Sequence, residues 1–165
     1  MTLAAVNKED LLDALIGLAD RQVEDLTRLA RETAAGATHE EARPDDNKDT
    51  RALEQTYLAR GQAERVVSAE SDLLVLRSVR CLPFAEDSPV AATALVEIED
   101  EDGVNRTLFL LPVAGGTKLE SGSRTVHIIT PHSPLGQALL EKCEGDEVEI
   151  RTGKTPRFWE IVGVS

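Results

Sequence analysis

Three aspartates in the first half of the chain, Asp45, Asp46 and Asp49, have the type and spacing best suited to chemistry. They stand in the stretch RPDDNKDTRALEQ, residues 43–55, together with a proline and three cationic side chains. Asp46 and Asp49 are three positions apart, so on a helix they share one face and can present two carboxylates to a metal ion. A solvated turn or a helix cap explains the same cluster equally well, and at this point all three interpretations stay open.

Helical periodicity precedes the aspartates. From about Lys8 the apolar residues recur at heptad spacing and form one broad stripe: Leu12, Leu15, Ile16, Ala19, Val23, Leu26, Leu29 and Ala30. Such a stripe predicts an amphipathic helix that packs against a partner. Pro44 is expected to end or redirect this helix, because proline lacks the N–H that a helix interior needs.

A second helical pattern follows the aspartates and runs to about Arg77. Its apolar stripe is Leu53, Tyr57, Ala63, Val67 and Leu74. Two long helices joined by a short polar segment make an antiparallel hairpin. Residues 1–80 are therefore predicted to form a coiled-coil hairpin with an acidic tip near residues 43–49.

The periodicity changes after the stretch CLPFAEDSP. Short runs rich in β-branched and aromatic residues alternate with turn signals: ATALVEIED, RTLFLLPV, SRTVHIIT, DEVEIRT and RFWEIVGV. One helix interrupts them, with Ser133 as its N-cap and Pro134 at its first position. Residues 85–165 are predicted to form a small, mostly antiparallel sheet with one short helix, and the whole chain an α+β protein.

Composition narrows the class of protein. The net charge of −12 over 165 residues argues against a surface that itself holds duplex nucleic acid, which needs clustered Lys and Arg. Cys81 and Cys143 form no paired motif, as is typical of a reducing compartment. The N-terminus lacks the pattern of a signal peptide, and no apolar run approaches the roughly 20 residues of a membrane span. We expect a soluble, cytoplasmic protein that does not bind membranes.

The last 40 residues carry a family resemblance. The segment ITPHSPLGQALLEKCEGDEVEIRTGKTPRFWEIVGV resembles the C-terminal domain of the bacterial transcript-cleavage factors GreA and GreB. The matching features are a Ser-Pro helix start, an ALL.K..GD.VE stretch and an aromatic final strand: Ser133, Pro134, Ala138 to Lys142, Gly145, Asp146, Val148 and Trp159. The resemblance implies an FKBP-like C-terminal domain that follows an N-terminal coiled-coil hairpin.

The hairpin tip of this family carries a Gly-Asp-x-x-Glu-Asn-x-x-Tyr pattern. In this chain Asp46 matches the family aspartate, and Asp49 replaces the glutamate. The neighbours differ, since Asp45 stands in the place of the glycine, Thr50 in that of the asparagine and Leu53 in that of the tyrosine. The acidic pair keeps its spacing while its surroundings change.

The resemblance implies an elongation factor that binds bacterial RNA polymerase. Its hairpin enters the secondary channel and stimulates Mg²⁺-dependent cleavage of backtracked RNA by the polymerase. Asp46 and Asp49 then bind the second Mg²⁺ of the polymerase site, with Asp45 as a third acid. The protein is an accessory factor without a cofactor of its own, rather than an enzyme.

Two further sets of residues receive roles from the same resemblance. Contact with the phosphates at the 3′ end of the extruded RNA is expected from the cationic residues that flank the acids: Arg43, Lys48 and Arg51. Docking on the polymerase is expected from the turn that contains His132, Ser133 and Pro134. The factor is expected to act as a monomer.

Three other functions compete with this one. A non-cleaving homologue of the Gre factors would occupy the same channel and inhibit or regulate the polymerase, and acid-rich tips occur in inhibitory homologues. A peptidyl-prolyl isomerase is suggested by the FKBP-like fold, but only 3% of the residues are aromatic, too few for the aromatic-lined pocket of those enzymes. A plain coiled-coil adapter gives no reason for acids at the tip.

Overall fold

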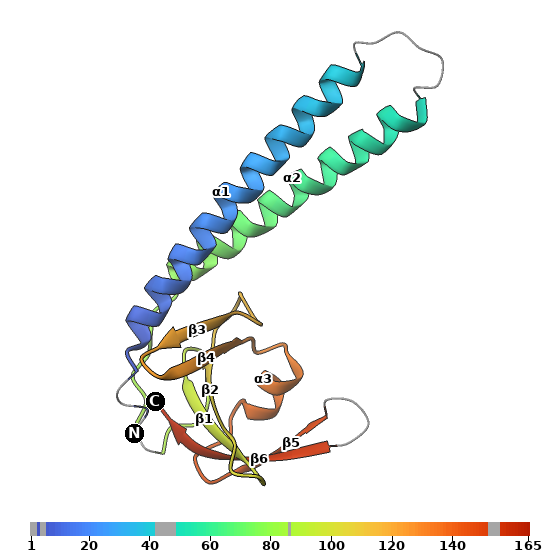
Figure 1. Ribbon diagram of the computed structural model, residues 1–165. Coiled ribbons are helices and arrows are strands. Elements are labelled where there is room, and N and C mark those ends of the chain that lie inside the picture. The colour runs from blue at the N-terminus through green and yellow to red at the C-terminus, as the bar shows by residue number, and fades with distance from the viewer. Residues whose placement is uncertain (1–2, 4–5, 42–48, 86, 152–155) are drawn as a thin grey trace. The chain divides into compact units, whose positions relative to one another are not determined.

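The structure of the protein, a computed structural model, describes residues 3, 6–41, 49–85, 87–151 and 156–165. Within these ranges the side chains of residues 37–41, 49–52 and 151 are not described. The chain divides into two compact units, one of Ile16–Leu74 and one of Met1–Leu15 with Val75–Ser165. Figure 1 shows the two long helices of the N-terminal half, then the sheet with its short helix. The predicted α+β class is confirmed.

Helix α1, Lys8–Glu41, buries the face that the heptad pattern predicted. Leu12 and Leu15 are buried, and half-buried positions continue along the same stripe: Ile16, Ala19, Val23, Leu26 and Ala30. Leu29 is the exception, because 43% of it is exposed. The helix ends three residues before Pro44, where the missing backbone N–H was expected to stop it.

Helix α2, Asp49–Ser78, turns a different face inward from the predicted one. The predicted stripe was wrong: Leu53, Tyr57, Val67 and Leu74 are 55–67% exposed, and Ala63 is exposed as well. The less exposed positions form a neighbouring heptad stripe: Gln55, Ala59, Gln62, Val66, Ala69, Leu73 and Leu76.

The C-terminal end of α2 explains why its buried face is rotated from the predicted one. Leu76 is 1% exposed and Leu73 is 7% exposed, so these two side chains decide which face of the helix is covered. A seam that repeats every 3.5 residues then runs back through small side chains such as Ala69 and Ala59. Val67 and Leu74, which directly follow residues of this seam, are exposed to solvent. Neither long helix, nor any other helix in the described ranges, is long and apolar enough to cross a bilayer.

The second unit is built on a six-stranded sheet in the order β3-β4-β2-β1-β6-β5. Its strands are β1 (Leu95–Asp100), β2 (Asn105–Leu110), β3 (Lys118–Ser121), β4 (Arg124–Ile129), β5 (Glu147–Arg151) and β6 (Pro156–Val164). All neighbouring strands are antiparallel except β2 and β4, which are parallel. The sheet is therefore mixed, and the prediction of a mostly antiparallel sheet holds with this one exception.

Strand β3 was not predicted from the sequence. It is an edge strand of four residues, and Leu119 is its one buried side chain. It pairs with β4 through the turn at Gly122, whose positive φ of 61° glycine adopts without strain.

One face of the sheet carries the hydrophobic core with helix α3, Pro134–Leu139. Alternate residues of the strands point to this face, as the two-residue repeat of a strand requires. The buried members of this core include Val96, Ile98, Leu108, Leu110, Leu139, Trp159 and Ile161.

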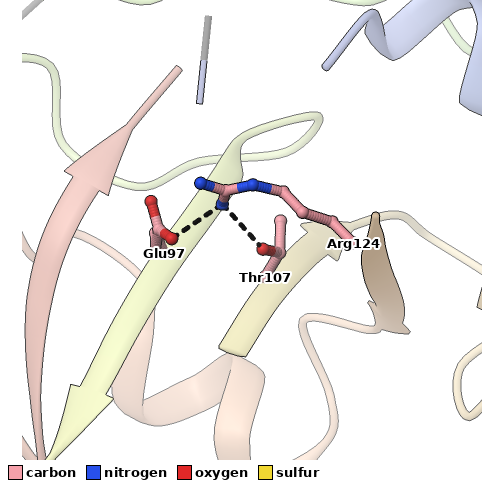
Figure 2. A network of polar contacts seen from close by, with 3 residues as sticks. All are labelled: Glu97, Thr107 and Arg124. Carbon is pink, nitrogen blue, oxygen red and sulfur yellow. Dashed lines mark hydrogen bonds and ion pairs between the residues drawn. The ribbon is translucent and has the colours of Figure 1, made fainter. Parts of the chain in front are cut away.

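The opposite face carries a polar network that joins three strands. Arg124 Nη1 donates to Glu97 Oε1 at 2.7 Å and to Thr107 Oγ1 at 3.3 Å (Figure 2). The side chains of Arg124 and Glu97 are 16% and 17% exposed, so water screens the pair only in part. The network links β4 to β1 across β2.

Candidate functional site

The acidic cluster lies mostly outside the described residues. Asp45 and Asp46 fall outside them, as do Arg43 and Lys48. Asp49 is the first residue of α2, and Arg51 follows in its first turn, but neither side chain is described. The metal-binding role of the three aspartates and the RNA-binding role of Arg43, Lys48 and Arg51 therefore stay predictions.

The docking turn, residues 132–134, is named for its predicted role, and the structure describes it in full. Ser133 has the extended backbone of an N-cap, and its Oγ accepts a hydrogen bond from the N–H of Gly136 at 3.0 Å. The same hydroxyl donates to the carbonyl oxygen of Thr130 at 2.7 Å. Pro134 is the first residue of α3, as predicted, so the missing N–H of proline leaves no helical bond unmade.

These contacts decide what each residue of the turn can do. The hydroxyl of Ser133 is half-buried and committed to two local hydrogen bonds, so its observed role is that of a cap. His132 and Pro134 are exposed and present their side chains to solvent. The turn is therefore a rigid support for two exposed side chains, which suits a docking surface.

Gly136 is a residue of this turn that the sequence did not single out. A Cβ built on it would overlap the carbonyl oxygen of Thr130 and come within 3.1 Å of Ser133 Oγ. Only glycine lets the first turn of α3 approach the end of β4 this closely. The glycine in the SPLG stretch was the signal available, but its reason needs the fold.

The GD pair after α3 has an equally specific structural role. Gly145 has a positive φ of 87°, and its N–H donates to the carbonyl oxygen of Ile161 at 2.8 Å. Asp146 Oδ2 accepts the N–H of Cys143 at 2.8 Å, which closes the turn into β5. The ALL.K..GD.VE stretch thus encodes the end of α3 and the start of the next strand.

Lys8 anchors the start of α1 within the larger unit. Its Nζ donates to the carbonyl oxygen of Leu82 at 2.6 Å and lies 4.6 Å from the ring centroid of Phe84. Burial lowers the pKa of Lys8, and burial likewise raises the pKa of the neighbouring Cys81 thiol, with Glu9 adding to that rise. This contact could not be predicted, because the partners of Lys8 are a backbone carbonyl and a ring some 75 positions away along the chain.

Comparison with known proteins points to one family. Residues 85–165 match the family described as "Transcription elongation factor, GreA/GreB, C-term". The transcription elongation factor GreA of Desulfovibrio desulfuricans is 28% identical over 145 residues, which cover 86% of this chain and 86% of the relative. Residues 85–165 therefore match the C-terminal domain of the GreA/GreB family, and the chain is similar to a GreA factor over most of its length.

Several solved structures of this family are similar to the chain. The GreA factor homolog 1 (Gfh1) of Thermus thermophilus is 20% identical, with a TM-score of 0.40, over 91% of this chain and 94% of its own. Gfh1 of Thermus aquaticus is 21% identical, with a TM-score of 0.41, over 90% and 92%. A GreA/GreB factor of Nitrosomonas europaea is 22% identical, with a TM-score of 0.37, over 59% and 78%.

The metal chemistry expected of a Gre factor is not located in the described part of this chain. Within the described ranges, no group of three or more His, Cys, Asp or Glu side chains is arranged to hold a metal ion. The candidate ligands are the tip aspartates, and their donor type fits, because carboxylate oxygens are the ligands that Mg²⁺ prefers.

Proposed function

We propose that this protein binds bacterial RNA polymerase, inserts its helical hairpin into the secondary channel and stimulates Mg²⁺-dependent cleavage of backtracked RNA. The proposal is supported by the match of residues 85–165 to the GreA/GreB family, by the similarity to a GreA factor, and by the sequence of the segment that joins the two long helices. The polymerase supplies the catalytic site, and this chain supplies ligands to it.

The position of the acids carries the proposal. α1 has 34 residues and α2 has 30, so at about 1.5 Å per residue each helix is roughly 45–50 Å long. Asp45 and Asp46 belong to the segment that connects these helices, and Asp49 begins the second one. Long helices on either side of an acidic connection suit a protein that delivers carboxylates into a deep, narrow channel.

Cleavage of RNA requires the acids to bind a metal ion and to orient the attacking water. Asp46 and Asp49, at i and i+3, can bind one divalent ion through carboxylate oxygens, directly or through water, and can orient the attacking water by hydrogen bonds. When bound, a second Mg²⁺ activates that water and stabilises the leaving oxygen of the phosphodiester. Arg43, Lys48 and Arg51 neutralise phosphates of the extruded RNA near the same point.

The docking turn supplies the second half of the function. His132 and Pro134 are exposed on a turn that Ser133 and Gly136 hold in one conformation. A preorganised turn loses little conformational freedom on binding, so its exposed side chains suit contact with the polymerase.

A second function is favoured by one observation on the acids themselves. Asp45 adds a third carboxylate, and Asp49 is one methylene shorter than the glutamate of the family pattern. Three crowded acids can bind the ion in an arrangement that does not orient water, and a displacement of ~1 Å reduces a reaction rate by about 10²-fold. The protein would then occupy the channel and regulate the polymerase without stimulating cleavage.

One assay separates the two functions. The full chain is added to a stalled, backtracked elongation complex with Mg²⁺, and RNA length is followed in time. Stimulated cleavage shortens the RNA, and the shortening disappears in Asp46→Asn. The matched control is Asp72→Asn, which removes the same charge from an exposed position on α2. Slower elongation without shortening supports the regulatory function, and no effect on the polymerase contradicts both.

A further inference from the structure

The core face of the sheet is hollowed by a cavity of about 470 Å³ near the start of α3. Its wall is mainly apolar and includes Ile98, Leu108, Leu135, Ile150 and Trp159. A volume in the range of roughly 300–1,000 Å³ is typical of sites for small organic ligands. None of its lining residues belongs to residues 45–49, and two of them, Ser133 and Pro134, belong to the docking turn.

Three basic side chains line the same cavity. Arg106 of β2 pairs in register with Ile98, His127 of β4 pairs with Leu108, and Arg157 of β6 pairs with Ile150. Paired residues share a face of the sheet, so each basic group stands next to an apolar wall residue.

No acidic side chain lines this cavity among the residues that the structure describes. That is unexpected in a chain with 30 Asp and Glu against 18 Lys and Arg. Arg106 has an aromatic neighbour instead, because its guanidinium carbon lies 4.8 Å from the ring centroid of Trp159. The cavity therefore combines an apolar floor with positive charge that no lining carboxylate neutralises.

His127 lies near two positive charges at this site. Burial is the main cause that lowers the pKa of His127, and the positive charges of Lys118 and Arg106 lower it further. The negative charge of Glu120 on β3 raises the pKa of His127. Arg157 is a further positive charge that lines the cavity. An anion placed beside these groups is attracted to them and favours the protonated form of His127.

We propose that this cavity binds a small organic anion that joins an apolar body to a single carboxylate or equivalent acid group. The apolar body lies against Trp159 and the neighbouring aliphatic side chains, and the acid group lies between Arg106 and Arg157. A cationic ligand is repelled by the same side chains. A neutral apolar ligand brings no negative charge to the two guanidinium groups and binds more weakly.

Trp159 gives a direct measurement, because it is the one tryptophan of the chain. Octanoate, octanamide and octylamine share a chain length and differ in charge. Each is titrated into the full-length protein while Trp159 fluorescence is followed. We expect saturable binding of octanoate at least about tenfold tighter than that of octanamide, and no binding of octylamine.

Substitutions of Arg106 and Arg157 test whether these residues bind the carboxylate of octanoate. Arg157→Gln and Arg106→Gln each weaken octanoate binding by about threefold to tenfold and leave octanamide unchanged, whereas Arg80→Gln, exposed and outside the cavity, changes neither. Arg106 and Arg157 are both exposed, so neither substitution removes a buried side chain from the fold. Octanoate binding also tightens as the pH falls through the pKa of His127, because the imidazole becomes protonated beside the anion.

Three results would overturn the proposal. Equal affinities for octanoate and octanamide would show an apolar site without a role for charge. Octanoate binding that is unchanged in Arg106→Gln and Arg157→Gln would place the anion elsewhere. Absence of any saturable change in Trp159 fluorescence or in the amide NMR signals of β2, β4 and β6 would show that the cavity takes no such ligand.

Discussion

The guanidinium of Arg124 lies 2.7 Å from the carboxylate of Glu97, across the strand that separates them in the sheet (Figure 2). Thr107 on that middle strand accepts a second hydrogen bond from the same nitrogen. One side chain of β4 therefore holds both β2 and β1, and the pair is largely withdrawn from water.

Removal of this arginine should destabilise the unit that contains the six-stranded sheet. Arg124→Met leaves Glu97 half-buried without its cation, so the free energy of unfolding should fall by about 1–3 kcal/mol in urea titrations. Arg28→Met is the control, because Arg28 and Asp25 form a pair that is 68% and 65% exposed. That variant should change stability by less than about 0.5 kcal/mol. Equal effects would mean that the Arg124 pair contributes no more than a surface pair.

The turn before α3 should depend on Gly136. Gly136→Ala forces a Cβ into the carbonyl oxygen of Thr130, so we expect a loss of at least about 2 kcal/mol and a distorted turn. Gly61→Ala is the matched control at an open position in the interior of α2, where alanine should stabilise by about 0.5–1 kcal/mol. Chemical denaturation measures both. A neutral Gly136→Ala would show that the turn tolerates a wider approach.

The rotation of α2 can be tested with two adjacent leucines. Leu73 is 7% exposed and Leu74 is 67% exposed. Leu73→Ala should therefore lower the free energy of unfolding by about 2–4 kcal/mol, whereas Leu74→Ala should stay within about 0.5 kcal/mol. The heptad stripe first predicted from the sequence requires the opposite order, so thermal unfolding of the two variants distinguishes the two faces.

Acid should act on the fold through His127. Its pKa is lowered in the folded state, so below about pH 6.5 the unfolded chain binds more protons than the folded one. The folded protein therefore loses stability as the pH falls from about 6.5, the pKa of histidine in the unfolded chain, toward the lower pKa of His127 in the folded state. His127→Gln should make the decline in stability between about pH 7 and pH 5 shallower. An unchanged slope in urea titrations across this range would contradict the assignment.

The two long helices show where sequence reasoning succeeds and where it fails. In α1 the large apolar residues form a single stripe, so the buried face could be predicted apart from Leu29. In α2 the larger apolar residues define one stripe and a neighbouring stripe runs through alanines, glutamines, Val66, Leu73 and Leu76. Which of the two is covered depends on tertiary packing at Leu76, and periodicity alone does not contain it.

The sheet and the turn before α3 likewise combine features that could be predicted from the sequence with features that could not. The cap at Ser133 and the helix start at Pro134 are local signals and were predicted correctly. Strand β3 has too few apolar residues to give a signal, and the parallel pairing of β2 with β4 depends on chain topology. The cavity could not be predicted either, because Arg106, His127 and Arg157 come together only when their strands pair.

The central claim concerns Asp46 and Asp49 as ligands for an ion in the polymerase site. Its most direct test is the rate of RNA cleavage in a backtracked elongation complex, measured across a range of Mg²⁺ concentrations. With the wild-type chain the stimulated rate should saturate at low Mg²⁺. With Asp46→Asn or Asp49→Asn it should fall by about 10²-fold and recover in part at high Mg²⁺, while Asp72→Asn behaves as wild type. Stimulation by the Asp46 and Asp49 variants at the wild-type rate and Mg²⁺ dependence would contradict the account.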